Sequence, residues 1–147
     1  YEQALAEARE LGYAEADPTY DVEGIDAGVK LVILANTILD MHTTLDDVER
    51  TGITLLTPDA LQLAEDLDCT IRLIGEIIPG AGVLRVSPRI VPKVHPLVVE
   101  GTLNAVTVEA DLAGDLTFIG KGAGSTETAS AVIGDLLYIR DRHVQGS

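Results

Sequence analysis

Apolar residues in the first third of the chain recur at the spacing of α-helices. Over residues 2–11 the alanines and leucines fall three or four positions apart, which predicts a helix that ends at Gly12. After a loop, Asp21 is placed to cap a second helix from about Val22 to Leu39. The second half of this helix is apolar nearly all round, so we expect it to be central and buried.

Two shorter helices are indicated by the residues at which they start. Thr44 offers an N-cap, and Asp46 and Asp47 follow in the first turn of a short helix. The segment Thr57-Pro58-Asp59 supplies a cap and then a proline at the first helical position. This second helix is expected to end near Asp68.

The hydrophobic period changes from helical to alternating at Cys69. Alternation over residues 69–78 predicts a strand, and the turn over residues 79–82 leads into a second hairpin arm over residues 83–92. Pro88 and Pro92 place the end of this arm at a sheet edge or a bulge, because proline has no N–H to donate. The other expected elements are strands over 103–111 and 115–119, a glycine-rich loop over 120–124 and a helix over 126–142.

An order of helices, then strands, then one last helix is typical of the α+β class. We therefore expect a mostly antiparallel β-sheet covered on one face by helices and a closing C-terminal helix. The chain has 147 residues, of which 46% are hydrophobic, and this is enough for one domain with its own core. Residues 1–147 are interpreted as a single domain.

The chain is strongly acidic, with 24 Asp and Glu against 10 Lys and Arg and a net charge of −14. Such a field repels nucleic acid and anionic membrane surfaces, which argues against both as partners. No apolar run reaches the roughly 18 residues that a membrane-spanning helix needs. Cys69 is the single cysteine, which fits a reducing cytoplasm, and no metal-ligand spacing is present. The excess of acids over lysines also supports the hypothesis that the protein works in high salt, where self-repulsion is screened.

One lysine, Lys30, directly precedes the most apolar stretch of the chain and follows a group of carboxylates. Asp26 and Lys30 are four residues apart and share a helix face, while Glu15, Asp17 and Asp21 lie just upstream. One interpretation is an ordinary ion pair with an aspartate N-cap. The other is a proton donor, because a lysine beside acids at a cleft can be tuned to donate a proton.

The glycine-rich loop over residues 120–124 is the second candidate site. A glycine loop that opens a helix presents free backbone N–H groups, which suit a phosphate or a carboxylate. Glycines in such a turn can equally serve chain geometry alone. His95, which precedes Pro96, is interpreted as a hydrogen-bonded structural histidine.

Taken together, these segments resemble the catalytic domain of homoserine dehydrogenase over nearly the whole chain. The resemblance is carried by Gly12-Tyr-Ala-Glu-Ala-Asp-Pro18 with the downstream Asp21, Asp26 and Lys30, and by Gly122-Ala-Gly124 followed by Thr128-Ala-Ser-Ala-Val132. Shorter matching segments are Gly52-Ile-Thr54, Gly75-Glu-Ile77, Pro88-Arg89, His95-Pro-Leu97 and Asn104-Ala-Val106.

The resemblance implies an oxidoreductase that interconverts aspartate β-semialdehyde and homoserine with NADP or NAD, in amino-acid biosynthesis. It implies that Lys30 donates the proton to the forming hydroxyl and that Glu15 holds the substrate amino group. By the same resemblance, Asp21 and Asp26 line the pocket, and Gly122 and Gly124 approach the dinucleotide. It also implies a homodimer with the sheet at the subunit interface.

The chain departs from the family pattern in two respects. Lys121 stands where the family often has proline, and this cation either strengthens phosphate binding or faces solvent. No strand followed by Gly-x-Gly-x-x-Gly and a helix is present, so the dinucleotide is expected to bind mainly outside this sequence. We therefore expect part of a longer enzyme that is inactive alone. The alternative is a stand-alone amino-acid-binding or dimerisation module without catalysis.

Overall fold

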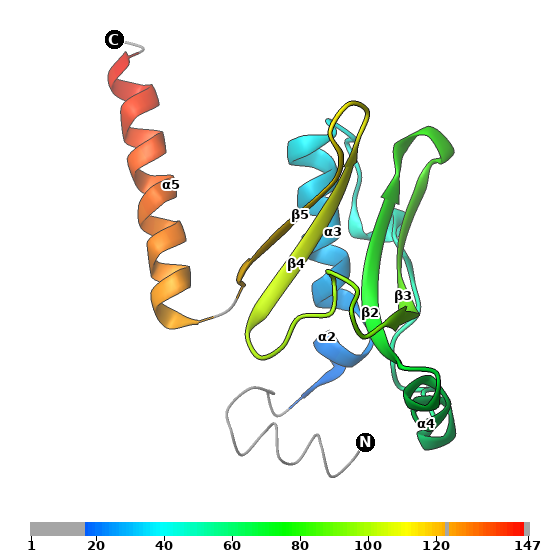
Figure 1. Ribbon diagram of the computed structural model, residues 1–147. Coiled ribbons are helices and arrows are strands. Elements are labelled where there is room, and N and C mark those ends of the chain that lie inside the picture. The colour runs from blue at the N-terminus through cyan, green and yellow to red at the C-terminus, as the bar shows by residue number, and fades with distance from the viewer. Residues whose placement is uncertain (1–16, 123, 146–147) are drawn as a thin grey trace. The chain divides into compact units, whose positions relative to one another are not determined.

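The computed structural model describes residues 17–122 and 124–145 (Figure 1). The expected helix over residues 2–11 lies outside the described residues. The chain divides into two compact units, residues 1–92 and residues 93–147, and each is described by itself. Among the residues described, none of the helices combines the length and the hydropathy that crossing a bilayer requires.

The described part of the first unit begins with two helices where the sequence predicted one long helix. Helix α2 (Thr19–Val22) is a single turn, and α3 (Ile25–Ile38) follows after a break. The break is at Gly24, whose φ of 73° lies in the left-handed region that glycine adopts without strain. Asp21 therefore lies inside α2 and is not the cap of the long helix, so that prediction was wrong.

The two shorter helices form where their starting residues predicted. The 3-10 turn η1 (Leu45–Asp47) has a capping box, in which the Thr44 N–H and hydroxyl both donate to the Asp47 carboxylate, at 2.7 and 2.8 Å. Helix α4 (Pro58–Asp66) starts at its proline, and the Thr57 hydroxyl accepts a hydrogen bond from the Ala60 N–H.

A three-stranded sheet in the order β1-β3-β2 completes this unit. The antiparallel hairpin of β2 (Cys69–Ile78) and β3 (Val83–Pro92), joined by the 3-10 turn η2 (Pro79–Ala81), has the predicted bounds. Strand β1 (Glu49–Arg50) was not predicted, and it pairs in parallel with Arg85 and Val86 of β3.

The prolines of β3 occupy the half of the strand that β1 does not reach. The Val86 carbonyl accepts a hydrogen bond from the Thr51 N–H, so even-numbered residues here direct their backbone polar groups away from β2. Pro88 and Pro92 share this parity, so their nitrogens point to the open side of β3. The expectation that these prolines mark a sheet edge is confirmed.

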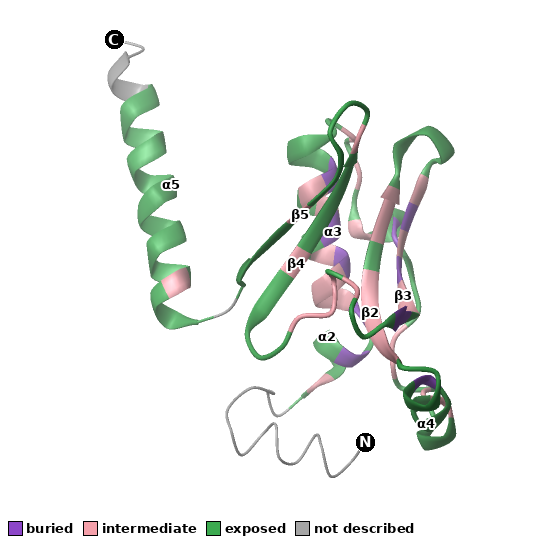
Figure 2. Ribbon diagram, in the orientation of Figure 1, coloured by how far each residue is buried: buried purple, intermediate pink, exposed green. Residues whose placement is uncertain are grey.

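The core of this unit lies between α3 and one face of the sheet, where Figure 2 shows the buried segments. Its centre is made of Leu31, Ala35, Val48, Leu84 and Val86. Val86 is 0% exposed, and burying such a side chain contributes about 1.5–3 kcal/mol. The opposite side of α3 is not buried within the described residues, because Ile33 is 56% exposed. The expectation of a helix buried on all sides was therefore wrong for this part of the chain.

The second unit contains a hairpin and a long helix. Strands β4 (Leu103–Ala110) and β5 (Gly114–Lys121) pair in antiparallel register, and α5 (Ser125–Gln145) follows. The four predicted strands and the unpredicted β1 thus fall into two small sheets, of three and two strands, among the described residues. The α+β class with antiparallel hairpins and a closing helix is confirmed.

Candidate functional site

The carboxylate of Asp26 and the ammonium of Lys30 form an ion pair on α3. Asp26 Oδ2 lies 2.7 Å from Lys30 Nζ, and the side chains are 46% and 53% exposed, respectively. The apolar residues that follow Lys30 therefore do not desolvate its charge, since solvent and Asp26 both receive it. A half-exposed pair at this spacing stabilises a helix by only about 0.3–0.5 kcal/mol. Both side chains can therefore contact another molecule at little cost to the stability of the helix.

The other acids of the predicted cluster are placed less completely. Asp21 is exposed on α2, one helix before the pair. Asp17 precedes α2, and its carboxylate accepts from the Thr19 N–H at 3.0 Å and the Thr19 hydroxyl at 2.5 Å. The N-cap residues of α2 and α3 are Pro18 and Gly24, and neither helix has a side-chain cap. Glu15 lies outside the described residues, and its role stays a prediction.

The glycine joint between α2 and α3 fixes the direction of the helix that carries Asp26 and Lys30. The Gly24 carbonyl accepts the Gly28 N–H at 2.9 Å, which makes it the first acceptor of α3. A Cβ at Gly24 would lie 3.1 Å from Val86 Cγ1, at the centre of the core. The joint is therefore seated directly on the sheet, and a side chain there would have to displace the core or strain the backbone.

The glycine loop lies in the second unit. The Gly122 N–H donates to the Thr102 carbonyl at 3.1 Å, and a Cβ at this position would overlap the Asn104 amide. Gly124 has a φ of 138°, and its carbonyl accepts the Thr128 N–H of the first turn of α5 at 3.0 Å. The backbone conformation favours glycine at Gly124, while a side chain at Gly122 would have to displace the Asn104 side chain. The interpretation as an anion-binding loop stays open beside this geometry.

Lys121 has an acidic partner at the start of α5. Its Nζ lies 3.4 Å from Glu127 Oε1, and a Cβ at Gly124 would overlap the Glu127 carboxylate. The carboxylate therefore lies against the glycine loop, at the helix end that attracts negative charge. Sequence reasoning assigned no role to Glu127, although its position three residues after a glycine and at the start of a helix is a recognisable signal.

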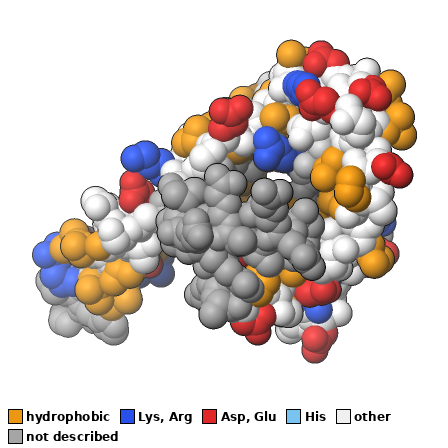
Figure 3. Space-filling model, turned by 90° about the horizontal axis from the view of Figure 1, so that it is seen from below, with side chains coloured by type: hydrophobic (Ala, Val, Ile, Leu, Met, Phe, Trp, Pro, Cys, Tyr) orange, Lys and Arg blue, Asp and Glu red, His pale blue; other side chains and the backbone are white. Residues whose placement is uncertain are grey.

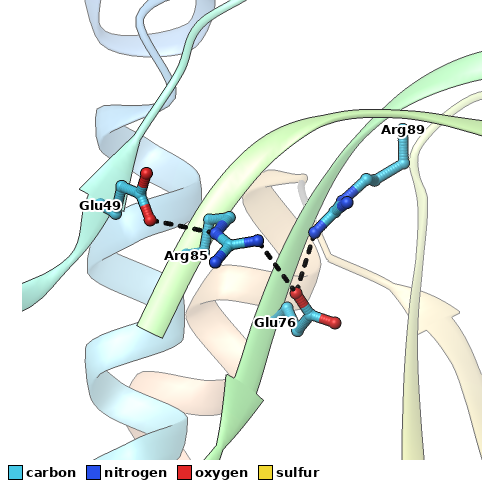
Figure 4. A network of polar contacts seen from close by, with 4 residues as sticks. All are labelled: Glu49, Glu76, Arg85 and Arg89. Carbon is cyan, nitrogen blue, oxygen red and sulfur yellow. Dashed lines mark hydrogen bonds and ion pairs between the residues drawn. The ribbon is translucent and has the colours of Figure 1, made fainter. Parts of the chain in front are cut away.

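A second charged group crosses the three-stranded sheet, on the face opposite α3 (Figure 4). Arg85 Nε lies 3.1 Å from Glu49 Oε2, and Arg89 Nη2 lies 2.9 Å from Glu76 Oε2, which Arg85 Nη1 approaches at 4.0 Å. Arg72 faces Arg89 across the hairpin, and its buried Nε has no hydrogen-bond partner among the described residues. Glu76 and Arg85 are opposite each other in the hairpin register. Since the turn over residues 79–82 sets this register, the sequence could have predicted that the two side chains are neighbours.

His95, possible metal ligands and the surface acids were also considered from the sequence, and the structure describes each of them. His95 Nδ1 accepts the Leu97 N–H at 3.2 Å, as expected of a hydrogen-bonded structural histidine. Within the described residues, no cluster of three or more His, Cys, Asp or Glu side chains could hold a metal ion. On the face drawn in Figure 3, acidic side chains are spread over the surface and do not gather in one patch.

The comparisons with known proteins point in one direction. The family model of homoserine dehydrogenase matches residues 1–137. A homoserine dehydrogenase of Methanocaldococcus jannaschii is 51% identical over 95% of this chain and 41% of its own length. The crystal structure of a putative homoserine dehydrogenase from Archaeoglobus fulgidus superposes with a TM-score of 0.86 at 55% identity, over 95% of this chain and 42% of that one.

Two further relatives carry a nucleotide in their names. One is an NAD(+)-dependent homoserine dehydrogenase of Pseudomonas canavaninivorans, 41% identical over 95% of this chain and 41% of its own length. The other is a hyperthermophilic archaeal homoserine dehydrogenase in complex with NADPH, with a TM-score of 0.75 at 31% identity over 92% of this chain and 39% of that one. This chain therefore spans about two fifths of the length of these relatives.

Proposed function

The chain belongs to the homoserine dehydrogenase family, and on that premise we propose that it forms the substrate-binding and proton-donating part of a homoserine dehydrogenase. The reaction is the reversible reduction of aspartate β-semialdehyde to homoserine. The observation that carries the proposal is the half-exposed Asp26–Lys30 pair, which holds an ammonium at the surface of α3.

Lys30 is the proton donor in this proposal. When a hydride adds to the aldehyde carbon, the carbonyl oxygen becomes an alkoxide, and one proton from the Lys30 ammonium completes the hydroxyl. In the reverse direction, the neutral amine takes that proton back from homoserine. Asp26, 2.7 Å away, orients the Nζ group. The ammonium of the amino-acid substrate needs its own carboxylates, and Glu15 and Asp21 supply them.

The hydride donor or acceptor is a nicotinamide dinucleotide, NADP or NAD. Gly122 and Gly124 fit a contact with it, because neither carries a side chain over the exposed backbone between β5 and α5. They do not make a whole nucleotide site, because the sequence has no Gly-x-Gly-x-x-Gly segment after a strand. The two relatives named for NAD(+) and NADPH support either nucleotide equally.

We also infer that the two units work as one catalytic domain and that the protein is a homodimer. The support for the dimer comes from the face of the sheet opposite α3, which carries the charged side chains of Arg85, Glu76 and Arg89. On the same face, Arg72 Nε is buried without an acceptor among the described residues, and a second subunit is a source of one.

The proposal is tested with the full-length gene product that contains this sequence. Homoserine-dependent reduction of NADP⁺ or NAD⁺ is followed by absorbance, with Lys30→Gln beside the wild type. We expect Lys30→Gln to lose a factor of about 10²–10⁴ in kcat, which is what a positioned general acid contributes. The homoserine KM should change far less, because Lys30 acts on the reacting oxygen.

Lys93→Gln is the matched control, since it makes the same change of charge at a lysine outside α3 and outside the predicted site residues, and it should keep the wild-type kcat. A wild-type protein that binds homoserine but oxidises none would refute the enzyme and favour the stand-alone binding module. Full activity of Lys30→Gln would refute the role of Lys30 while leaving the reaction in place.

A further inference from the structure

A short backbone segment after β1 ties the joint between α2 and α3 to the sheet. The Thr51 N–H donates to the Val86 carbonyl at 2.8 Å, and the Ile53 N–H donates to the Val22 carbonyl at 2.8 Å. Val86 is at the centre of the core, and Val22 is the last residue of α2. Residues 51–53 thus link the most buried strand to the helix that carries Asp21.

Gly52 lies between these two hydrogen bonds and touches the backbone of α2. A Cβ at Gly52 would overlap the Val22 carbonyl oxygen and would lie 2.7 Å from Glu23 Cα. Both neighbours are backbone atoms, which cannot rotate aside. Elsewhere the close neighbours of a glycine are movable side chains, as at Gly75, where the nearest atom is Leu31 Cδ1 at 2.9 Å.

The contact is placed where it controls the candidate site. Val22 and Glu23 follow Asp21 directly and precede the Gly24 joint, beyond which α3 carries Asp26 and Lys30. A side chain at position 52 would push this backbone off the loop and shift Asp21 relative to α3. A shift of about 1 Å in the groups that position a substrate can cost on the order of 10²-fold in kcat/KM.

We propose that Gly52 is a positioning residue for the protein carboxylates that bind the substrate. Its missing side chain lets residues 51–53 hold the α2–α3 joint at the distance at which Asp21, Asp26 and Lys30 meet one substrate. This inference rests on the proposed function for the identity of that substrate. The contact itself stands on the backbone geometry.

The test compares Gly52→Ala with Gly80→Ala in the full-length gene product. Gly80 is the matched control, because a Cβ there meets nothing within 4 Å. We expect Gly52→Ala to raise the homoserine KM by about tenfold or more, as misplaced binding groups do, with the dinucleotide KM unchanged. A purely structural role would instead lower the amount of folded enzyme, and hence kcat, with both KM values unchanged.

A second variant and a second readout keep the inference open to refutation. Ile53→Pro removes the N–H that Val22 accepts without adding a Cβ at position 52, and it should raise the homoserine KM in the same way if Gly52→Ala does not fold. Hydrogen exchange should increase over residues 19–30 in the folded variant and stay unchanged over residues 69–78. A wild type without homoserine oxidation refutes the proposed function alone, whereas unchanged exchange over 19–30, or a homoserine KM equal to that of Gly80→Ala, overturns the role of Gly52.

Discussion

Asp26 Oδ2 lies 2.7 Å from Lys30 Nζ across one turn of α3, with both side chains about half exposed. The pair is close enough to orient the ammonium and too solvated to hold it tightly. The contact should therefore contribute little to the free energy of unfolding and more to catalysis, and a substitution can separate these two contributions.

Asp26→Asn should leave the fold intact and impair the reaction. The loss of the pair should change the free energy of unfolding by less than about 0.5 kcal/mol, because exposed helix pairs contribute no more. The homoserine KM should rise, since a carboxylate near the substrate is lost. Urea unfolding and steady-state kinetics measure the two effects, and Asp26→Glu should recover part of the activity. A large loss of stability with normal kinetics would contradict this view.

The close contact between Gly75 and Leu31 predicts that a larger side chain at position 75 lowers the free energy of unfolding. A Cβ at Gly75 would lie 2.9 Å from Leu31 Cδ1, so Gly75→Val should overpack the contact between β2 and α3. We expect a loss of about 1–3 kcal/mol, the usual range for overpacking. Gly75→Ala should cost less, because the Leu31 side chain can move. Equal unfolding midpoints in urea for the valine variant and the wild type would show that the contact is looser than described.

Glu127 and Lys121 predict an effect on nucleotide affinity. The Glu127 carboxylate lies against the glycine loop, where it would compete with a phosphate. Glu127→Gln should lower the dinucleotide KM severalfold, although it removes a favourable helix-dipole interaction of about 0.3–1 kcal/mol. Lys121→Gln should raise that KM. If neither variant changes the dinucleotide KM, Lys121 and Glu127 serve only each other.

Asp47 predicts a local response to acid. Hydrogen bonds from the Thr44 backbone N–H and from the Thr44 hydroxyl lower the pKa of Asp47. A depressed carboxylate pKa stabilises the fold above the unfolded-state pKa, and this contribution is lost as the pH falls through the folded-state pKa. Thr44→Val keeps the backbone donor and removes the hydroxyl, so the Asp47 pKa should move part of the way back toward its ordinary value. An NMR titration of the Asp47 carboxyl below about pH 4 measures it, and an identical titration in both proteins would contradict the assignment.

The acidic composition predicts a dependence of folding on salt. With a net charge of −14, the folded chain repels itself at low ionic strength. At about 1 M salt the Debye length falls to about 3 Å, which screens most of this repulsion. The thermal midpoint should therefore rise as KCl is added, with an uncharged osmolyte as control. Full stability in dilute buffer would remove the hypothesis of a high-salt protein.

The elements that the sequence predicted correctly are those whose sequence pattern is local, within a few residues of the element itself. The hairpin of β2 and β3 follows from alternation plus a Pro-Gly turn, and the start of α4 follows from Thr57-Pro58. Strand β1 has two residues and pairs with a strand 36 positions later, which leaves no local trace. The break at Gly24 was missed because the apolar period runs through it. The signal for the turn is the packing of Gly24 against Val86, which lies far along the sequence.

The candidate site divides in the same way. The spacing of Asp26 and Lys30 predicted their contact, because residues four apart on a helix are neighbours. The contact between Gly52 and Val22 depends on the path of the chain after β1, so no spacing could reveal it. Glu15 lies outside the described residues, so its role stays a prediction.

The prolines of β3 have a consequence for how this protein avoids aggregation. Beyond Val86, the positions of β3 whose backbone would face an incoming strand are Pro88, Ile90 and Pro92, and only Ile90 has an N–H to offer. A foreign strand that aligned there would find one donor where a normal ladder has three, so cross-β growth could not propagate from it. The backbone edge of β3 beyond Val86 is thereby kept from acting as a template for misfolded copies of the chain.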